Sequence, residues 1–399
     1  MLSQPQRQPQ SPKSQSKSRL YSLQILNYSG NALSKPYVNL YLLASGVSVT
    51  TLGVLLSIAA LFEMLVPPLL SMVADHYRLH RLLYIGFISS LALGNLLLAL
   101  FDQIPVLIVA VILIEATFRP TMTLGLQLVI TRMSYESRQH VGRVRGFSSL
   151  GFSMGSFIAN WLFVVGGYFA LFSSAAFAYL TSLSLTGSLP QATTEKQEKA
   201  TVTRVPRTRA FYLIAISMFF IMMGQRIGYA FWFIHFQQNL GLSTEHLAVL
   251  SAVMALSEIP FFVLLDRILL SINVRVAFWA GGVGMAFVWM AVGILPDSTW
   301  ILPLILVRGF LFSIFHLSTF LVINQASHPE NVATNQAIAQ GTIPSIATLL
   351  TGAISGWIYG NLGVVALFTG VMSVTLIGMV ISVFALRDAK VDRIPAQQQ

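Results

Sequence analysis

The sequence predicts an all-α membrane protein with twelve transmembrane helices in two six-helix repeats. Three observations support this fold class. Of 399 residues, 55% are hydrophobic and only 10% are charged, whereas soluble domains carry about 25% charged residues. Twelve apolar stretches have the length that a helix needs to cross a bilayer, about 20 residues. The second half of the chain also repeats the pattern of the first.

Short polar connections separate the twelve predicted spans. The spans cover residues 20–44, 50–73, 80–101, 104–131, 142–164, 167–187, 209–236, 246–266, 275–295, 300–327, 333–360 and 363–386. They lack the strict alternation of apolar and polar residues that marks a transmembrane β-strand. We therefore expect each span to be an α-helix.

Basic residues predict the topology. Of the 24 Lys and Arg residues, 20 lie in the two tails, in the central linker, or in and beside the connections that follow the second, fourth and eighth spans. The connections on the opposite side, around Ser45, Gln103, Gly166, Leu242, Asp297 and Asn361, contain no Lys or Arg. Because cytoplasmic loops are enriched in Lys and Arg, we expect a multi-pass protein of the plasma (cell inner) membrane with both termini in the cytoplasm. The net charge of +10 is then a topology signal rather than a sign of nucleic-acid binding.

Polar segments divide the chain into domains. We predict a disordered cytoplasmic tail at 1–19, a six-helix bundle at 20–187, a cytoplasmic linker at 188–208, a second bundle at 209–387 and a cytoplasmic tail at 388–399. The first segment has neither the apolar core nor the cleavage site of a signal peptide. The chain has no cysteine, which excludes disulfides and thiolate metal sites.

Two pairs of segments carry the internal repeat. Residues 46–63 read GVSVTTLGVLLSIAALFE and residues 241–258 read GLSTEHLAVLSAVMALSE, so both end in Ala-Leu-x-Glu. More weakly, residues 114–130 (IEATFRPTMTLGLQLVI) parallel residues 307–323 (VRGFLFSIFHLSTFLVI). Each repeat has an even number of spans and starts on the same side. The two repeats therefore have the same orientation in the membrane.

The loop after the second span resembles a motif of the major facilitator superfamily. Members carry a G-x-x-x-D-x-x-G-[RK]-[RK] type loop there, and residues 71–81 read SMVADHYRLHR. Asp75 and the basic cluster are retained, although both glycines are replaced. The resemblance implies that Asp75, Arg78 and Arg81 form a cytoplasmic gate, and Asp75 is also suited to cap the next helix.

The fifth span begins with a second motif. GRVRGFSSLGFSMG, from Gly142, resembles the G-R-x-R-x-W-G-S-x-G-F stretch of proton-coupled permeases of the lactose, nucleoside and phenylpropionate type, with Phe147 and Ser148 replacing Trp-Gly. The resemblance extends over nearly all of residues 20–386. It implies the major facilitator fold, in which two bundles surround a central cavity near the bilayer midplane.

Several ionisable side chains fall inside the predicted spans. They are Lys35, Glu63, Glu115, Arg119, Arg226, Glu258, Arg308 and His316. A charge at the bilayer centre costs at least about 2.5 kcal/mol, so these groups should pair or face the cavity. Four cations against three carboxyls predict a substrate that is anionic or forms strong hydrogen bonds. Several of these residues also lie beside prolines within the spans, which remove backbone hydrogen bonds there.

Each of these groups has a candidate role. The candidate substrate contacts are Lys35, Arg119, Arg226 and Arg308, with the amides Asn31 and Gln340; Arg119 or Arg226 is suited to grip an anion in a fork. For proton coupling, Glu63 and Glu258 come first, followed by His316 and Glu115. Lactose permease and its relatives are similar in having a glutamate on the eighth span and a histidine on the tenth. The glutamate one turn after that histidine is Thr319 here.

Plainer roles compete with these hypotheses. Glu115 and Arg119 stand four residues apart and are equally suited to neutralise each other on one helix face. His316 is alternatively a neutral hydrogen-bonding histidine of the core. Both alternatives remain open from the sequence.

The predicted function is secondary active transport. The sequence has no nucleotide-binding loop, metal-ligand cluster or recognisable catalytic triad, so we expect neither an enzyme nor a cofactor. We expect a proton gradient to drive the symport of a small polar or anionic organic solute. We also expect the protein to be monomeric in the bilayer. The alternatives are a proton-antiport exporter of a drug or metabolite on the same fold and, from another class, a membrane receptor or scaffold without transport.

Overall fold

The structure is a computed structural model that describes residues 17–77, 79–132, 141–187, 207–271, 273–328 and 331–388. Within these ranges the chain is almost wholly helical and contains no strand. The helices are α1 (Lys17–Ala44), α2 (Val49–Tyr77), α3 (His80–Leu100), α4 (Ile104–Arg132), α6 (Val141–Gly187), α7 (Arg209–Gln238), α8 (Thr244–Ser271), α9 (Val274–Ile294), the short 3₁₀-helix η1 (Ser298–Trp300), α10 (Ile301–Ala326), α11 (Val332–Ala337), the π-helix η3 (Ile338–Thr342) and α12 (Ile343–Asp388).

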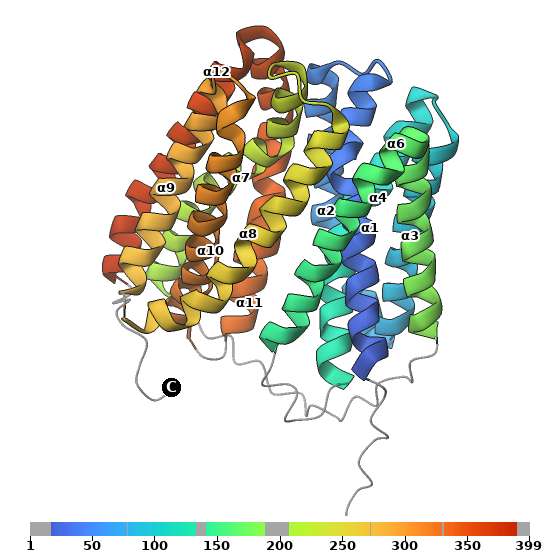
Figure 1. The fold of residues 1–399 in the computed structure, drawn as a ribbon. Helices are drawn as coiled ribbons and strands as arrows, with labels where there is room; N and C mark the ends of the chain where they lie inside the picture. The colour runs from blue at the N-terminus through green and yellow to red at the C-terminus, as the bar shows by residue number, and fades with distance from the viewer. Residues whose placement is uncertain are drawn as a thin grey trace, which may run out of the picture.

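Two long helices each contain a pair of predicted spans. The backbone of α6 leaves the helical conformation at Gly166 and at Gly167, whose φ is 57°. The backbone of α12 does so at Gly363, whose φ is 85°. Glycine adopts positive φ without the penalty that a Cβ imposes. Both helices fold back on themselves at these points, as the predicted connections near Gly166 and Asn361 require (Figure 1).

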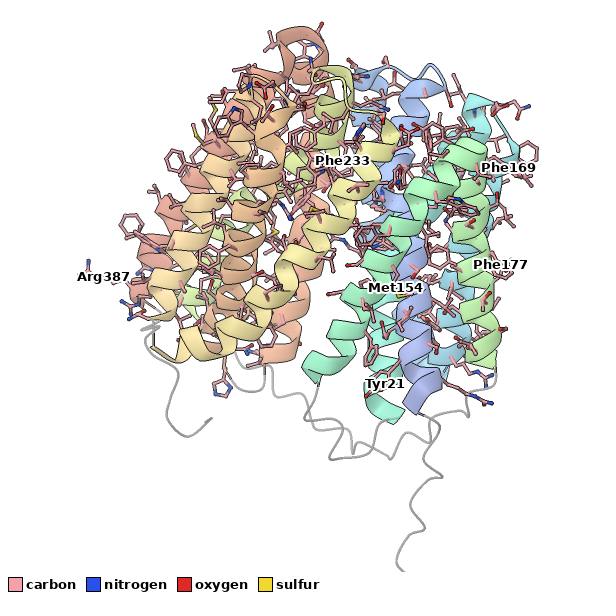
Figure 2. The ribbon with its side chains drawn as sticks, in the orientation of Figure 1. Tyr21, Met154, Phe169, Phe177, Phe233 and Arg387 are labelled. Carbon is pink, nitrogen blue, oxygen red and sulfur yellow. The ribbon has the colours of Figure 1, made fainter. Side chains whose placement is uncertain are left out.

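The helices have the lengths that a membrane protein needs. Eight helical stretches of the described chain are long and apolar enough to cross a membrane, and the kinked stretches in α6 and α12 each supply two passes. The more polar helices α1 and α8 contribute the remaining two predicted spans. Large apolar side chains cover the outer surface; Phe169 and Phe177 of α6 point outward in Figure 2 and are 59% and 71% exposed. The predicted all-α membrane fold is confirmed.

The two halves pack their helices in the same way. In the first half α1 packs along α6, and α2 contacts α4. In the second half α7 packs along α12, and α8 contacts α10. Figure 1 shows the two bundles side by side, one coloured blue to green and the other yellow to red.

The bundle has two distinguishable ends. We call the end at which α1, α3, α7 and α9 begin the basic end, because Arg19, Arg81, Arg209, Arg275 and Arg387 lie there. The end that carries the connections near Ser45 and Gly241 is called the opposite end.

The halves meet most closely in the part of the molecule nearer the opposite end. A Cβ on Gly53 of α2 would lie 2.4 Å from the carbonyl oxygen of Gly352 in α12, and one on Gly356 would lie 2.7 Å from the carbonyl oxygen of Val49. The backbone N–H of Ala353 donates to Ser57 Oγ at 2.9 Å across the same contact. These small residues let the backbones of α2 and α12 touch. The contact joins the two halves near the opposite end.

Most residues of the predicted tails and linker lie outside the described residues. α7 begins at Arg209, where the second bundle is predicted to start. α1 begins at Lys17, three residues before the predicted first span.

Candidate functional site

Two ion pairs connect three helices of the first half. Lys35 of α1 pairs with Glu115 of α4. One helical turn further along α4, Arg119 pairs with Glu63 of α2, with 2.8 Å between Arg119 Nε and Glu63 Oε1. Glu115 and Arg119 therefore each have an ion-pair partner on a neighbouring helix. The arrangement therefore differs from the alternative in which Glu115 and Arg119 only neutralise each other along α4.

Arg119 also reaches across to the second half. Its Nη1 donates to the backbone carbonyl of Gln340 at 3.4 Å. Gln340 lies in the π-helix η3, and the residue four positions later is Pro344, which has no N–H to donate back to that carbonyl. The irregular helix thus leaves a backbone acceptor for Arg119.

Amide side chains continue this polar surface along α11 and η3. Gln340 Nε2 donates to Gln336 Oε1 at 2.6 Å, and Gln336 Nε2 donates to Asn324 Oδ1 at 2.8 Å. Gln340 itself is exposed.

The second half contains a third ion pair in an aromatic setting. Arg308 of α10 is 2% exposed, and its Nη1 lies 3.1 Å from Glu258 Oε1 of α8. Its Nη2 donates to the hydroxyl of Tyr229 in α7. The guanidinium carbon lies 4.9 Å from the ring centre of Tyr229, 5.3 Å from that of Trp232 and 5.0 Å from that of Phe312. This environment holds the buried cation by cation–π contact as well as by charge.

His316 lies one turn beyond Phe312 on α10. The two rings stack with their centres 5.6 Å apart. Arg308, Phe312 and His316 thus follow one another along one face of α10, with the arginine turned into the core and the histidine nearer the basic end.

Arg226 of α7 differs from the other three intramembrane cations. Lys35, Arg119 and Arg308 take part in the ion pairs above. Arg226 Nη2 is buried and has no hydrogen-bond partner among the described residues. A buried guanidinium nitrogen without a hydrogen-bond partner is costly.

Arg226 lies one helical turn from a contact between α7 and α1. Arg226 shares a face of α7 with Tyr229 and Ala230. The carbonyl of Ala230 accepts a hydrogen bond of 3.2 Å from Asn39 Nδ2 of α1. One turn toward the basic end from this contact lie Arg226 on α7 and Lys35 on α1. The two cations therefore lie at a similar level along the bundle.

Asn31 lies one further turn along the same face of α1. It is 8% exposed, and its Oδ1 has no hydrogen-bond partner among the described residues. With Arg226, this amide supplies a second unsatisfied polar group at the level of the ion pairs.

The predicted gate is described only in part. Arg78 lies outside the described residues, and the side chain of Asp75 is likewise not described, although its backbone belongs to α2. Arg81 is partly buried near the start of α3 and has an interaction partner. The role of this gate stays a prediction.

Sequence reasoning missed the aromatic residues that surround Arg308. Tyr229 was detectable from its position three residues after Arg226, on the same helix face. Trp232 gave no such signal, because aromatic residues are common throughout the spans. The described residues include no group of three or more His, Asp or Glu that could hold a metal ion.

Comparison with solved structures identifies the fold. The chain is similar to the nucleoside transporter NupG, with a TM-score of 0.73 at 16% identity over 94% of this chain and 98% of that one. It is similar to a peptide transporter POT solved with sulfate, with a TM-score of 0.72 at 12% identity over 98% of both chains. The human organic anion transporter MFSD10 gives a TM-score of 0.59 at 14% identity, over 94% of this chain and all of that one, 100%.

Comparison of sequences identifies the family. No curated protein sequence matches significantly. The MFS_1 like family, in contrast, matches residues 19–370, which is nearly the whole chain. The protein therefore belongs to the MFS_1 like family and is a membrane transporter with the major facilitator fold.

Proposed function

We propose that the protein is a proton-coupled symporter that takes up a small polar or anionic organic solute by alternating access. The observation that carries this proposal is the Arg119–Glu63 ion pair and its hydrogen bond to the Gln340 carbonyl of the other half. The pair connects a titratable carboxyl to a contact between the two halves, which must move relative to each other during transport. Protonation of that carboxyl is then able to bias their relative position.

Exposure separates the roles of the candidate carboxyls. The side chain of Arg119 is 27% exposed, whereas that of Arg308 is 3% exposed. If Glu63 takes up a proton, Arg119 keeps access to solvent, to solute and to the Gln340 carbonyl. If Glu258 takes up a proton, Arg308 is left as a buried charge without its carboxylate, which is strongly unfavourable. We assign proton coupling to Glu63 and a structural role to Glu258.

Arg226 is the proposed anchor for the solute. It brings a guanidinium with an unsatisfied N–H to the level of Lys35, and the exposed Gln340 amide lies on the surface that Arg119 reaches. An anionic group pairs with Arg226 in a fork, and amides bind the rest of a polar solute. Nucleosides and organic anions, which name two of the similar transporters, belong to these chemical classes.

The distribution of basic residues indicates which end of the protein faces the cytoplasm. With the basic end in the cytoplasm of a cell inner membrane, both termini are cytoplasmic and the contact between α2 and α12 lies toward the outside. The conformation is then closed to the outside. Release of solute and proton into the cytoplasm precedes the separation of α2 from α12. The proton gradient supplies the energy, without a cofactor and within one chain.

Proteoliposomes that contain a pH-sensitive dye test the proposal. Candidate solutes are added outside, and solute uptake and internal pH are followed together. Symport predicts that the interior becomes acidic only when the solute enters. Alkalinisation during uptake would instead indicate the proton-antiport exporter, and absence of flux for every solute would favour a receptor or scaffold. Asp297→Asn removes an exposed carboxyl at the opposite end and is the control for substitutions of the buried carboxyls. It should transport as the unchanged protein does.

A further inference from the structure

We propose that a pocket between α7 and α12 at the basic end binds the headgroup of an anionic phospholipid. The pocket has a volume of about 520 Å³. It is lined by Arg209 and Leu213 of α7 and by Ile381, Phe384 and Arg387 of α12. Two guanidinium groups from distant parts of the chain thus meet above three apolar side chains.

The packing of α7 against α12 explains why a pocket forms there. Ser217 Oγ donates to the carbonyl of Gly378 at 2.8 Å, and a Cβ on Gly378 would lie 2.7 Å from the carbonyl oxygen of Ser217. The two helices therefore touch at this level. Toward the basic end the larger side chains of Leu213, Ile381 and Phe384 follow. They hold the helix ends apart and leave space between them.

Helix length places the two arginines at the headgroup level. α7 has 30 residues and is about 45 Å long at about 1.5 Å per residue, whereas the hydrocarbon core is about 30 Å thick. Its first turns therefore extend beyond the hydrocarbon. Arg209 begins α7 and Arg387 lies in the last turn of α12, so both lie in that region.

The chemistry of the pocket matches a phosphodiester attached to acyl chains. Arginine binds phosphate oxygens in a fork, and the N-terminus of α7 adds the positive end of its helix dipole beside Arg209. Phe384 is 62% exposed and lies on the apolar outer surface, so acyl chains have apolar surface directly below the charges. Figure 2 shows Arg387 at the outer edge of the second half, on the side away from the first half.

This pocket is separate from the proposed transport site. Arg209 precedes Arg226 by 17 positions on the same helix, a distance of about 25 Å along the axis. Failure of the transport proposal would leave the lipid proposal intact, because lipid binding is measured on the protein without solute.

The first half provides an internal comparison. α1 packs along α6 as α7 packs along α12, and Ser182 Oγ donates to Asn27 Oδ1 at 2.7 Å between them. α6 ends at Gly187 with no basic residue in its last turn, whereas the last turn of α12 contains Arg387. The convergence of two arginines is therefore not a general consequence of the repeat. Arg19, which is exposed in α1, is the matched control residue for Arg209.

Lipid titration of the purified full-length protein tests the proposal. Binding of phosphatidylglycerol and phosphatidylcholine is measured by native mass spectrometry for the unchanged protein, the Arg209→Gln/Arg387→Gln variant and the Arg19→Gln control. We expect phosphatidylglycerol to bind more tightly than phosphatidylcholine. The double variant should bind phosphatidylglycerol about tenfold more weakly, as expected for the loss of charge-assisted hydrogen bonds, and Arg19→Gln should bind it unchanged.

Three results would overturn the assignment. One is equal loss of binding in the Arg19→Gln control, and another is unchanged phosphatidylglycerol binding in the double variant. The third is competition by inorganic phosphate at the same concentration as the lipid, which would show a free-anion site. If the double variant does not fold, Phe384→Ala serves instead: it keeps both arginines, and it should weaken phosphatidylglycerol binding while leaving the response to inorganic phosphate unchanged.

Discussion

Arg119 and Arg308 each pair with a glutamate, but only the side chain of Arg119 is partly exposed, 27% against 3% for Arg308. The cost of neutralising the glutamate depends on that difference. For Arg308, the loss of a carboxylate leaves a buried charge, and breaking such a pair costs about 3–5 kcal/mol. For Arg119, the partly exposed side chain retains its hydrogen bond to the Gln340 carbonyl. Two glutamates in equivalent repeat positions, Glu63 and Glu258, consequently have different expected roles.

Glu63→Gln should uncouple transport from protons. The glutamine imitates the protonated carboxyl at every pH, so we expect solute exchange to continue while uptake against a gradient is lost. The pH dependence of uptake should flatten because the titrating group is absent. The measurement is uptake in proteoliposomes between pH 5 and 8, with and without an imposed pH gradient. Uptake that retains the pH profile of the unchanged protein would assign the coupling proton to another group.

Glu258→Gln should instead destabilise the protein. Arg308 keeps Tyr229 and the aromatic contacts but loses its carboxylate, so we expect a lower thermal unfolding temperature in detergent and reduced yield. Glu63→Gln, at the equivalent repeat position, is the control and should unfold close to the unchanged protein. If the two variants unfold at the same temperature, the assignment of Glu258 as a structural residue is wrong.

Arg226→Gln should reduce transport of an anionic solute by about ten- to a hundredfold in kcat/KM, because a charge-assisted hydrogen bond is worth about 1.5–3 kcal/mol. Arg226→Lys retains the charge but loses the fork, and we expect intermediate activity. The comparison uses the carboxylate solute identified in the screen and its uncharged amide. The amide should be affected little by either substitution. An equal loss for both solutes would show that Arg226 supports the fold rather than the anion.

Part of the candidate site was predictable from the sequence. The charge pattern identified the residues that pair, because charged side chains inside apolar spans are rare and need partners. It did not identify the partner of each residue. Glu115 and Arg119 are one turn apart, yet they contact α1 and α2, since the choice of partner depends on helix packing. Arg226 became distinctive only when the other three cations had been paired in the structure.

At the scale of elements, glycine positions decide where the halves approach each other. Gly53 and Gly356 lie where a Cβ would meet backbone atoms of the facing helix, and backbone cannot move aside as a flexible side chain does. The sequence has glycines at 352, 356 and 360, but the helix that they contact is known only from the structure. The π-helix η3 was also not predicted. It lies within the predicted span 333–360, just before Pro344, and a local proline signal does not distinguish a kink from a π-helix.

Gly53→Ala should weaken the contact between α2 and α12 and favour the conformation open to the opposite end. The sequence has no cysteine, so Asn39→Cys provides one reporter thiol on α1, where α1 meets α7 of the other half. We expect a membrane-impermeant maleimide, added from the opposite end, to label this thiol several times faster in Gly53→Ala. Gly86→Ala is the control, because a Cβ on Gly86 has open space. Equal labelling rates in both variants would exclude the contact as the seal.

At the scale of the whole molecule, alternating access requires the halves to separate wherever they now touch. Ser57 and Ala353 belong to different halves and are joined by a hydrogen bond near the opposite end. A cross-link between cysteines at these two positions should therefore stop transport, because the closed conformation cannot be left. The cysteine-free background allows this test without removing native thiols.

A pair within one half supplies the control for that cross-link. Gln237 Nε2 donates to Thr244 Oγ1 at 3.1 Å between α7 and α8, near the same end of the molecule. Both double-cysteine variants are reconstituted and treated with a short bifunctional thiol reagent, and solute uptake is measured before and after cleavage of the reagent. The Ser57→Cys/Ala353→Cys protein should lose uptake reversibly, while Gln237→Cys/Thr244→Cys should retain it. Uptake that survives complete cross-linking between the halves would mean that they do not separate at this contact, and the transport cycle would then have to use a motion inside one bundle.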